Sequence, residues 1–395
     1  MADLRYGIVT FKDQRVGVLS ELSDGGCRFA YDAGVTRSIS CSLPVSRPVH
    51  DHPHGLHPFF AHLAPEGWLR GRQTAYADVD RNDDFGILLA FGADCIGAVG
   101  VIDPAYSHDR VRLKEGTPAL DAAAVAGDRT ISGVQAKVLC REEEGAVVPA
   151  AADGPAPLIA KYHAEPPLHD MVANEATTLE LCRLLLGDQE VVQAGLGPVA
   201  GIDGVALLVR RFDRRGGEKL ACEDVAQIIG KPPGLDFKGK YEASYEVLGK
   251  ALEHSAARLL DARQVFKRLV AFVLVGNVDC HLKNWSLLET PEGLRLSPAY
   301  DVQNGYIYGA AGYTTRFGLM VGTGRMQWER YDRALLLTIA EHLGLPRRAA
   351  EGVLREVARL KEPVLRRLDA SLRLNEERTW AYRATVRSAW ERIFD

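Results

Sequence analysis

Several features that would place this chain in a specialised class of protein are missing from its sequence. Its seven cysteines are scattered, odd in number and free of any Cys-x-x-Cys pair, so we expect reduced thiols rather than a disulfide framework. No apolar run approaches the roughly 18 residues that span a bilayer. The opening residues, MADLRYGIVTF, lack the charged start and apolar core of a signal peptide. These absences predict a cytoplasmic protein with no membrane contact.

The composition is that of an ordinary globular protein. Of its 395 residues, 47% are hydrophobic and 25% are charged, which is enough apolar material for a sizeable core. The formal net charge of −4 argues against a general affinity for nucleic acid. The length allows two domains or one large domain with two lobes.

The hydrophobic pattern changes along the chain from strand-like to helical. The first 30 residues contain β-rich segments with turn signals between them: YGIVTF, RVGVLSEL and CRFAYD. Residues 171–186 repeat apolar side chains at three- and four-residue steps, which predicts a helix. From about Asp224 the pattern is mostly helical, with a long apolar helix in DARQVFKRLVAFVLVGN. A small mixed lobe followed by a larger helical lobe is an α+β, two-lobed arrangement.

The segment GNVDCHLKNWSLL concentrates polar side chains directly after that apolar helix. Asp279 and Asn284 have the Asp-to-Asn spacing of the protein-kinase catalytic loop. In that loop the aspartate accepts or orients the proton of the attacking hydroxyl, and the asparagine holds magnesium. Lys283 could offset charge on the transferring phosphoryl group, and His281 could orient Asp279. A polar helix C-cap is the alternative, but a cap explains one polar residue rather than four.

Asp301, in SPAYDVQN, follows one short predicted hairpin after Asn284. Protein kinases place their second metal-binding aspartate at such a position. Magnesium takes few carboxylates and several waters, and Asp279, Asn284 and Asp301 form a sparse set of oxygen ligands of that kind. Taken alone, Asp301 would be an ordinary turn residue.

Three weaker signals lie upstream. In DRTISGVQAKVLC, Gly133 follows Thr130 and Ser132 and leads into a strand, and backbone amides of such loops cradle phosphates. Lys161 lies on the short apolar strand of PLIAKYH, as either an edge-strand solubiliser or a buried phosphate anchor. Glu175 in the next helix could pair with it, although an exposed helix glutamate is the default. The order of all these signals is that of a kinase sequence.

At these positions the sequence resembles the HipA family, the serine/threonine-kinase toxins of bacterial toxin–antitoxin pairs. The segments of this sequence that resemble the family's successive motifs are TISGVQAK, LIAKYH, VANEATTLEL, LVRRFDR, KYE, GNVDCHLKN and PAYD. Those that resemble the family's N-terminal subdomain are CSLPV, PFFAHLAPEGWLR and FGADCIGAV. The resemblance implies a protein-kinase-like fold with a β-rich N-terminal subdomain over residues 1–105. It implies a kinase-like domain over 106–395, divided into a small lobe, 106–212, and a helical lobe, 213–395.

The resemblance also implies ATP and Mg²⁺ as cofactors and a site for them. The catalytic residues would be Asp279 and Lys283. The ATP-binding residues would be Ser132, Gly133, Val134, Gln135, Ala136 and Lys137 in the phosphate loop, Lys161 as anchor, Arg210, Arg211 and Phe212 in the hinge, and His281, Leu282, Lys283, Asn284, Tyr300 and Asp301. The metal ligands would be Asn284 and Asp301. Arg210 departs from the family pattern, which usually has glutamate there.

The function implied by the resemblance is phosphorylation of a protein substrate, an aminoacyl-tRNA synthetase or another translation factor, which inhibits growth. Self-inactivation by autophosphorylation in the phosphate loop is implied as well, at Thr130 or Ser132. The implied partner is a HipB-like helix-turn-helix antitoxin, with operator DNA contacted through the complex.

Two alternatives remain open at this point. The chain could be a catalytically silent co-repressor that acts only by binding its antitoxin and DNA. It could also be a metal-dependent hydrolase that binds zinc through the histidine-rich stretch. The histidines of that stretch are His50, His52, His54, His57 and His62. Two prolines interrupt the stretch and no HExxH spacing is present, which favours a solvated loop.

Overall fold

The computed structural model describes residues 4–105, 111–127, 129–131, 133–151, 154–164, 168–372 and 374–395. The chain forms two compact units. Unit 1 comprises Met1–Tyr162, Gly197–Ala206 and Arg211–Gly239, and unit 2 comprises His163–Leu196, Leu207–Arg210 and Lys240–Asp395. Within the described ranges, no helix combines the length and apolar character that a membrane span requires.

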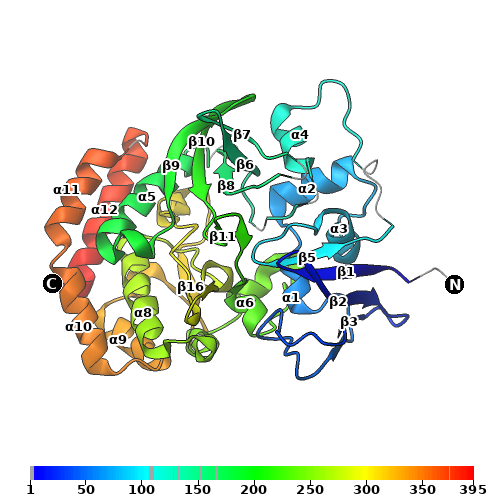
Figure 1. The fold of residues 1–395 in the computed structure, drawn as a ribbon. Coiled ribbons are helices and arrows are strands. Elements are labelled where there is room, and N and C mark those ends of the chain that lie inside the picture. Colours follow the sequence, from blue (N-terminus) through cyan, green and yellow to red (C-terminus); the bar gives the residue numbers. More distant parts are fainter. Residues whose placement is uncertain are drawn as a thin grey trace. The chain divides into compact units, whose positions relative to one another are not determined.

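Unit 1 begins with an antiparallel five-stranded sheet in the order β4-β3-β2-β1-β5, drawn in blue and cyan in Figure 1. Strand β3 alternates buried with more exposed side chains, as expected for a sheet with one face on a core, whereas β5 is buried over its first three residues. Phe29 of β3 packs edge-on against Phe60 of α1, with ring centroids 5.4 Å apart. The elements are β1 (Tyr6–Phe11), β2 (Gln14–Glu21), β3 (Cys27–Tyr31), β4 (Val49–His52), α1 (Pro58–Ala61), α2 (Gly67–Tyr76), α3 (Asp84–Phe91) and β5 (Val99–Ile102).

The segment FFAHLAPEGWLRGRQTAYA forms two helices, α1 and α2. Pro65 lies between them, and proline cannot supply the N–H that a helix interior needs. Gly67 then adopts a φ of 55°, a left-handed conformation that also interrupts a helix. The short linking segment positions the backbone of Gly67 and Trp68 against the phosphate loop described below.

The second sheet of unit 1 has the strand order β7-β6-β8-β10-β9. Strands β9 and β10 each continue along the chain into unit 2. A short helix, α4, lies in this unit and was not predicted, because its seven residues are too few and too alanine-rich to show a clear period. The elements are α4 (Ala119–Val125), β6 (Lys137–Glu143), β7 (Ala146–Pro149), β8 (Leu158–Lys161), β9 (Ala194–Val199), β10 (Ile202–Arg210), β11 (Arg214–Arg215), β12 (Glu218–Lys219), β13 (Cys222–Asp224) and α6 (Val225–Ile228).

Unit 2 is built mainly from helices around α8. Nearly every residue of α8 from Val265 to Leu274 is buried, and α5, α10 and α12 all pack against it, so α8 is the central helix that the sequence predicts. The last helices are drawn in orange and red in Figure 1. The helices are α5 (Met171–Leu186), α7 (Glu246–Ala251), α8 (Arg258–Leu274), α9 (Arg333–His342), α10 (Arg347–Ala358), α11 (Lys361–Ser371) and α12 (Glu376–Phe394).

Two hairpins interrupt the helical part of unit 2. The predicted one is β14 (Ser286–Thr290) with β15 (Gly293–Leu296). The second, β16 (Arg316–Val321) with β17 (Gly324–Gln327), was not predicted, although its two turn glycines, Gly322 and Gly324, are an ordinary hairpin signal.

The predicted fold class, α+β with a β-rich N-terminal part and a helical C-terminal part, is confirmed. The domain boundaries remain predictions. Residue 105 lies inside unit 1 rather than at a division between the units, and one compact unit can hold two domains of a family.

Candidate active site

The predicted catalytic loop begins where α8 ends. Gly276 follows the last turn with a φ of 71°, in the left-handed region that glycine favours. A Cβ at this position would overlap the side-chain amide of Asn304, so only glycine allows the two segments to approach this closely. The N–H of Asn277 donates to the carbonyl of Phe272 at 2.9 Å. The polar loop is therefore fixed to the end of a buried helix.

Residues 281–284 close into one tight turn. The N–H of His281 donates to Oδ1 of Asn284 at 3.0 Å, and the N–H of Asn284 donates to the carbonyl of His281, also at 3.0 Å. Leu282 is fully buried and anchors the turn, Asn284 is buried, and Asp279 is exposed. The turn thus fixes the Asn284 amide from within while Asp279 faces solvent.

Asp301 lies beside Asn284, with the asparagine Nδ2 3.5 Å from the Asp301 Oδ2. Asp301 has a φ of 55°, a left-handed conformation that costs a non-glycine residue about 1 kcal/mol or more. Oδ1 of Asn284 accepts one hydrogen bond but has a second lone pair. Carboxylate and amide oxygens are suitable ligands for Mg²⁺, so this pair fits the predicted metal site.

Asp279 is hydrogen-bonded by Tyr241, a residue with no predicted role. The hydroxyl of Tyr241 donates to Oδ1 of Asp279 at 2.6 Å. The Tyr241 ring in turn meets the ring of His281 edge-on, with centroids 5.0 Å apart. His281 therefore contacts Tyr241, the hydrogen-bond partner of Asp279. That His281 itself orients Asp279 remains a prediction. The KYE motif contained Tyr241, but nothing in the motif indicated this contact.

Tyr300 ties the two parts of the site together through its hydroxyl. The hydroxyl donates to the carbonyl of Lys283 at 2.7 Å and lies 2.5 Å from the Ser286 hydroxyl. Both Tyr300 and the Lys283 side chain are half-buried. The residue before Asp301 is thereby fixed to the residue before Asn284, which keeps the two candidate metal ligands in register.

A second support for Asp301 comes from α5. The side chain of Asn174 donates to the carbonyl of Asn304 at 3.0 Å and accepts from its N–H at 2.8 Å. It also donates to the Tyr308 hydroxyl at 3.1 Å, and Thr178 bonds the Asn174 carbonyl. Asn174 is fully buried. One side chain thus fixes the backbone three residues beyond Asp301, a role that a single sequence does not reveal.

Glu175, the neighbour of Asn174, is almost fully buried, so the default expectation of an exposed helix glutamate is wrong. Lys161 is also buried and is the last residue of β8. It is therefore not an edge-strand solubiliser. The pairing of Lys161 with Glu175 remains a prediction.

The predicted phosphate loop lies in unit 1 between Arg129 and β6. Gly133 has a φ of 116°, which favours glycine. A Cβ on Gly133 would overlap the Nζ of Lys137, so the lysine ammonium occupies the hollow that the missing side chain leaves. Ser132 lies outside the described residues. A hollow lined by backbone and one ammonium group fits a phosphate.

Lys137 and Lys161 are directly opposite one another in the antiparallel pair β6–β8. Opposite residues of such a pair point to the same face, and both lysines are buried. Like charges opposite one another are unfavourable in a sheet, and an anionic ligand offsets that cost. The two predicted phosphate-binding lysines thus share one face of one sheet.

The rest of the loop is fixed by backbone contacts. The side chain of Gln135 donates to the Tyr162 carbonyl at 2.6 Å, and the Tyr162 N–H donates to the Ala136 carbonyl at 2.9 Å. The N–H of Trp68 donates to the carbonyl of Val134 at 3.3 Å. Val134 itself is 68% exposed. The loop is thus held at its end while its tip faces solvent.

Thr130, one of the two predicted autophosphorylation sites, is buried. Its hydroxyl donates to the Leu63 carbonyl at 2.7 Å and approaches the Cys95 sulfur at 3.3 Å. A hydroxyl with these bonds and 1% exposure cannot reach a nucleotide in this conformation.

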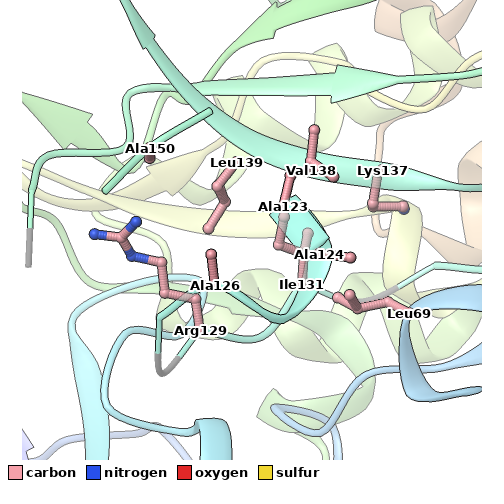
Figure 2. A pocket seen from close by; sticks show the side chains of 10 residues that line it. All are labelled: Leu69, Ala123, Ala124, Ala126, Arg129, Ile131, Lys137, Val138, Leu139 and Ala150. Carbon is pink, nitrogen blue, oxygen red and sulfur yellow. The ribbon is translucent and has the colours of Figure 1, made fainter. Parts of the chain in front are cut away.

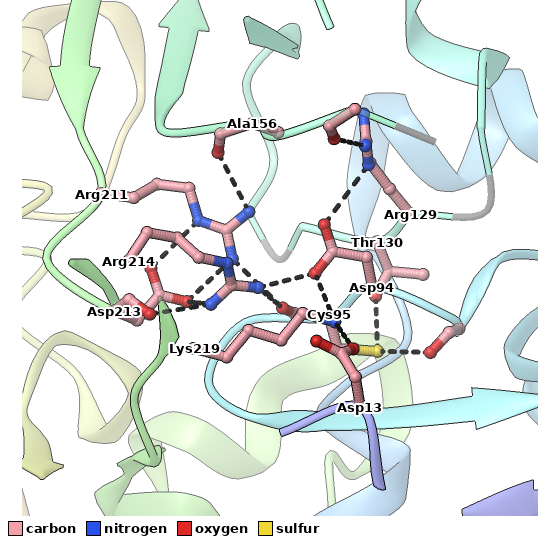
Figure 3. A network of polar contacts seen from close by, with 12 residues as sticks. Asp13, Asp94, Cys95, Arg129, Thr130, Ala156, Arg211, Asp213, Arg214 and Lys219 are labelled. Atoms are coloured by element: carbon pink, nitrogen blue, oxygen red, sulfur yellow. Dashed lines mark hydrogen bonds and ion pairs between the residues drawn. The ribbon is translucent and has the colours of Figure 1, made fainter. Parts of the chain in front are cut away.

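Of the predicted hinge residues, Arg210 is exposed, Arg211 is buried and Phe212 is half-buried. The Arg211 guanidinium belongs to the ion-pair network in Figure 3, where it pairs with Asp213 at 2.8 Å. Arg214 also pairs with Asp213, at 2.8 Å, and with Asp94 at 2.6 Å. Burial alone would raise the pKa of Asp213, but the two guanidinium groups hold it below its usual range. The Arg211 side chain therefore has a structural partner.

The network in Figure 3 extends to the start of the phosphate loop. Asp94 also pairs with Arg129, at 3.3 Å, and the Thr130 N–H donates to the Asp94 carbonyl at 3.2 Å. Buried ion pairs of this kind fix geometry because removing either partner leaves an uncompensated charge. The network thus links the predicted hinge to the phosphate loop within unit 1.

A small pocket lies where α2, α4 and β6 meet (Figure 2). Its wall is mostly alanine and aliphatic side chains, with Arg129 and Lys137 as its two charged members. The lining residues are Leu69, Ala123, Ala124, Ala126, Arg129, Ile131, Lys137, Val138, Leu139 and Ala150. Because Lys137 contributes to this wall and to the Gly133 hollow, the pocket adjoins the phosphate loop.

The histidine-rich stretch does not assemble a zinc site. Nε2 of His50 bonds the Pro44 carbonyl at 3.1 Å, and Nε2 of His62 bonds the Lys231 carbonyl at 2.7 Å. His57 accepts the N–H of Phe59 at 3.2 Å and caps α1. In the described parts of the chain, no three His, Cys, Asp or Glu side chains gather as metal ligands.

Comparison with known proteins identifies the family. The HipA N-terminal domain matches residues 7–102, and the HipA-like C-terminal domain matches residues 129–363. Two proteins of Sinorhizobium fredii with provisional kinase names are similar to this chain over about three quarters of their own length. Y4dM is 30% identical over 318 residues, which are 73% of this chain and 74% of Y4dM. Y4mE is 26% identical over 330 residues, 74% of this chain and 76% of Y4mE.

The fold is similar to that of the toxin HipA of Shewanella oneidensis MR-1, solved in complex with HipB and its operator DNA. The superposition covers 98% of this chain and 97% of that one, with a TM-score of 0.76 and 19% sequence identity. At this identity the likeness shows the fold alone. The two domain matches and the relationship to Y4dM show that this kinase-like chain belongs to the HipA family.

Proposed function

We propose that this protein is an ATP-dependent serine/threonine protein kinase of the toxin–antitoxin type. The observation that carries the proposal is the approach of Asn284 to Asp301, 3.5 Å between side-chain atoms, with Asp279 exposed on the same loop as Asn284. A protein with only a binding function does not need an exposed carboxylate on the same loop as an amide that contacts a second carboxylate. This arrangement favours a kinase over the catalytically silent co-repressor.

The roles in unit 2 follow from the chemistry of phosphoryl transfer. Asp279 accepts the proton of the attacking hydroxyl, and Lys283 offsets charge on the transferring group. Asn284 and Asp301 would hold Mg²⁺, which when bound neutralises phosphate charge. His281, Leu282 and Tyr300 shape the surrounding nucleotide contacts.

The roles in unit 1 concern binding of ATP, the phosphoryl donor. The phosphate loop, Ser132–Lys137, binds phosphate oxygens through backbone N–H groups and the Lys137 ammonium. Lys161 adds a second cation on the same sheet face. Arg210–Phe212 contribute mainly backbone groups to adenine binding, because the Arg211 side chain is engaged by Asp213.

The self-phosphorylated residue in this proposal is Ser132. Thr130 is buried and bonded to the Leu63 carbonyl, so of the two candidate hydroxyls of the loop we choose Ser132. A phosphate there adds a charge of about −1.5 to −2 where the phosphates of ATP bind, and so inactivates the kinase. Phosphopeptide mapping after incubation with ATP tests the choice, and phosphate found only on Thr130 would contradict it.

We further propose a HipB-like helix-turn-helix antitoxin as partner, and operator DNA as a ligand of the complex. The support is the fold shared with the Shewanella protein, which was solved with HipB and operator DNA. The protein substrate would belong to the translation machinery, as an aminoacyl-tRNA synthetase or another factor.

The experiment that tests the kinase proposal compares wild type with Asp279→Ala. We expect the variant to lose roughly 10²–10⁴ in the rate of phosphoryl transfer, measured with labelled ATP, while calorimetric ATP affinity stays within a few-fold. Asp188→Ala is the control, since Asp188 is an exposed aspartate of the same unit. Full activity of Asp279→Ala would contradict the proposal.

A further inference from the structure

The proposed function gives no role to Tyr241, whose side chain lies beside the candidate catalytic aspartate. It ends a 3-10 turn over Leu235–Tyr241 in which Asp236 and Phe237 have φ values of 51° and 58°. Both values lie in the left-handed region, which is unfavourable for residues with side chains. The hydroxyl of Tyr241 donates to Oδ1 of Asp279 at 2.6 Å. A strained backbone segment thus delivers a hydroxyl group to the exposed carboxylate.

Burial does not account for this hydrogen bond. Elsewhere in unit 2, Tyr308 and Tyr382 are buried, and their hydroxyls bond Asp170 at 2.9 Å and Thr178 at 2.7 Å. Such bonds are needed because a buried polar group without a partner is costly. Asp279 is exposed, and water can solvate its carboxylate, so its folded state does not require the tyrosine. The hydrogen bond from Tyr241 therefore bears on the proposed reaction, because Asp279 is the candidate catalytic residue.

The ring of Tyr241 is held by groups that do not involve the hydroxyl. The Arg325 guanidinium lies 4.6 Å from the ring centroid, the His281 ring lies edge-on at 5.0 Å, and the Lys240 Nζ lies 5.8 Å away. Cation–π contacts of this kind favour a defined ring position. Removing only the hydroxyl leaves these contacts in place, which makes the hydrogen bond separable by mutation.

A serine or threonine acceptor must donate its hydroxyl proton to Asp279 in the proposed reaction. The Tyr241 hydroxyl already makes that donation. We propose that Tyr241 occupies the place of the acceptor hydroxyl and restricts access to Asp279 until the tyrosine turns away. This inference rests on the proposed kinase function and adds a residue that competes with the acceptor. Acceptors able to displace the tyrosine hydroxyl are thereby selected over others.

The test compares Tyr241→Phe with wild type in the intact chain, with Mg²⁺ and ATP as the only additions. Release of inorganic phosphate measures transfer to water, and intact mass measures transfer to the chain's own hydroxyls. We expect both rates to rise roughly three- to tenfold, the size expected for loss of one competing hydrogen bond. The ATP dissociation constant should change by less than about twofold, because the substitution keeps the ring contacts of Tyr241 with His281 and Arg325.

Tyr306→Phe is the matched control. The Tyr306 hydroxyl donates to Oε1 of Glu329 at 2.5 Å, a tyrosine–carboxylate contact of the same unit without a candidate catalytic residue, and its loss should leave both rates unchanged. Thermal unfolding of each variant establishes that the fold is intact. Asp279→Ala in the Tyr241→Phe background should abolish the gain.

The outcomes separate this inference from the function on which it rests. If Asp279→Ala abolishes transfer but Tyr241→Phe is no faster than wild type, the tyrosine does not compete with acceptors and the inference is wrong. A slower Tyr241→Phe would likewise overturn it, since the hydroxyl would then assist Asp279. If Asp279→Ala is as active as wild type, the kinase proposal and the inference both fail.

Discussion

The candidate phosphate-binding region of unit 1 and the candidate catalytic region of unit 2 are supported in different ways. Around the phosphate loop, the supporting groups are charged: Arg211, Arg214 and Arg129 pair with Asp213 and Asp94. Around Asp301, the supporting groups are neutral amides and hydroxyls. They are Asn174, Thr178, Tyr300, Asn304 and Tyr308. The charged pair Asp170–Arg378 lies only at the far end of this second network, beyond Tyr308.

The difference has a physical reason. Charged groups near a carboxylate shift its pKa and compete for its ligands, and the amides and hydroxyls described above around Asn284 and Asp301 add no charge of that kind. Around the phosphate loop the charges occur in pairs, because Arg211, Arg214 and Arg129 each lie beside Asp213 or Asp94. The predictions that follow test this contrast, beginning with the largest expected effect.

Asp213→Ala should be the most destabilising change. It leaves the guanidinium groups of Arg211 and Arg214 buried without their main partner, which costs about 3–5 kcal/mol. Denaturant unfolding measures the loss, and Asp203→Ala, at an exposed aspartate of β10, is the control. Because the folded-state pKa of Asp213 is lowered, its contribution is present above the unfolded pKa of about 4 and is lost as pH falls through the folded value. A loss below about 1 kcal/mol at neutral pH would contradict the supporting role.

Glu223 is a buried carboxylate of unit 1 that accepts hydrogen bonds from neutral donors, and it sharpens the comparison. Ser40 and Cys41 donate to it at 2.6 and 3.0 Å, and burial raises its pKa to about 7. Its contribution to stability is therefore complete below the unfolded value of about 4.5 and decreases as pH rises toward 7. Glu223→Gln should remove this decrease and stabilise unit 1 at pH 8 by about 2–3 kcal/mol. Glu218→Gln, at an exposed position, should leave the pH profile unchanged.

Asn174→Ala tests the neutral scaffold. It leaves the backbone N–H and carbonyl of Asn304 without their partner in a buried site, at a cost of about 2 kcal/mol. We expect weaker activation by Mg²⁺ as well, because the turn containing Asp301 loses its support. Gln189→Ala, an exposed side chain of the same unit, is the control. Unaltered stability together with an unaltered magnesium dependence would show that α5 does not position Asp301.

Gly133→Ala should have the smallest effect on stability and a specific effect on ligand binding. The new Cβ would displace the Lys137 ammonium from its hollow, and we expect ATP affinity to fall about tenfold, or about 1.4 kcal/mol. Gly145→Ala is a close control, because Gly145 also has a positive φ, 83°, but has open space at its Cβ. Equal ATP affinities for the two variants would mean that backbone strain, rather than the lysine position, decides the result.

The parts of the fold that could be predicted are those with a strong local pattern. Helix α5 spans Met171–Leu186, the bounds that its period of apolar residues predicts, and α8 is the central buried helix. The short α4 and the β16–β17 hairpin were missed, because seven residues or two four- to six-residue strands give little periodic signal. Gly67, with a φ of 55°, adds a break between α1 and α2 that the helical period around Pro65 does not show.

The sequence by itself determined the chemistry that this protein can offer: the order of the phosphate loop, the strand lysine and the Asp–Asn loop, and the family to which these belong. Tertiary structure alone decided which groups meet. Tyr241 is 38 residues from Asp279, and Asn174 is 130 residues from Asn304; neither pair follows a local period. Local patterns specify helices and strands because backbone hydrogen bonds repeat along the chain, whereas contacts between distant side chains depend on how those elements pack.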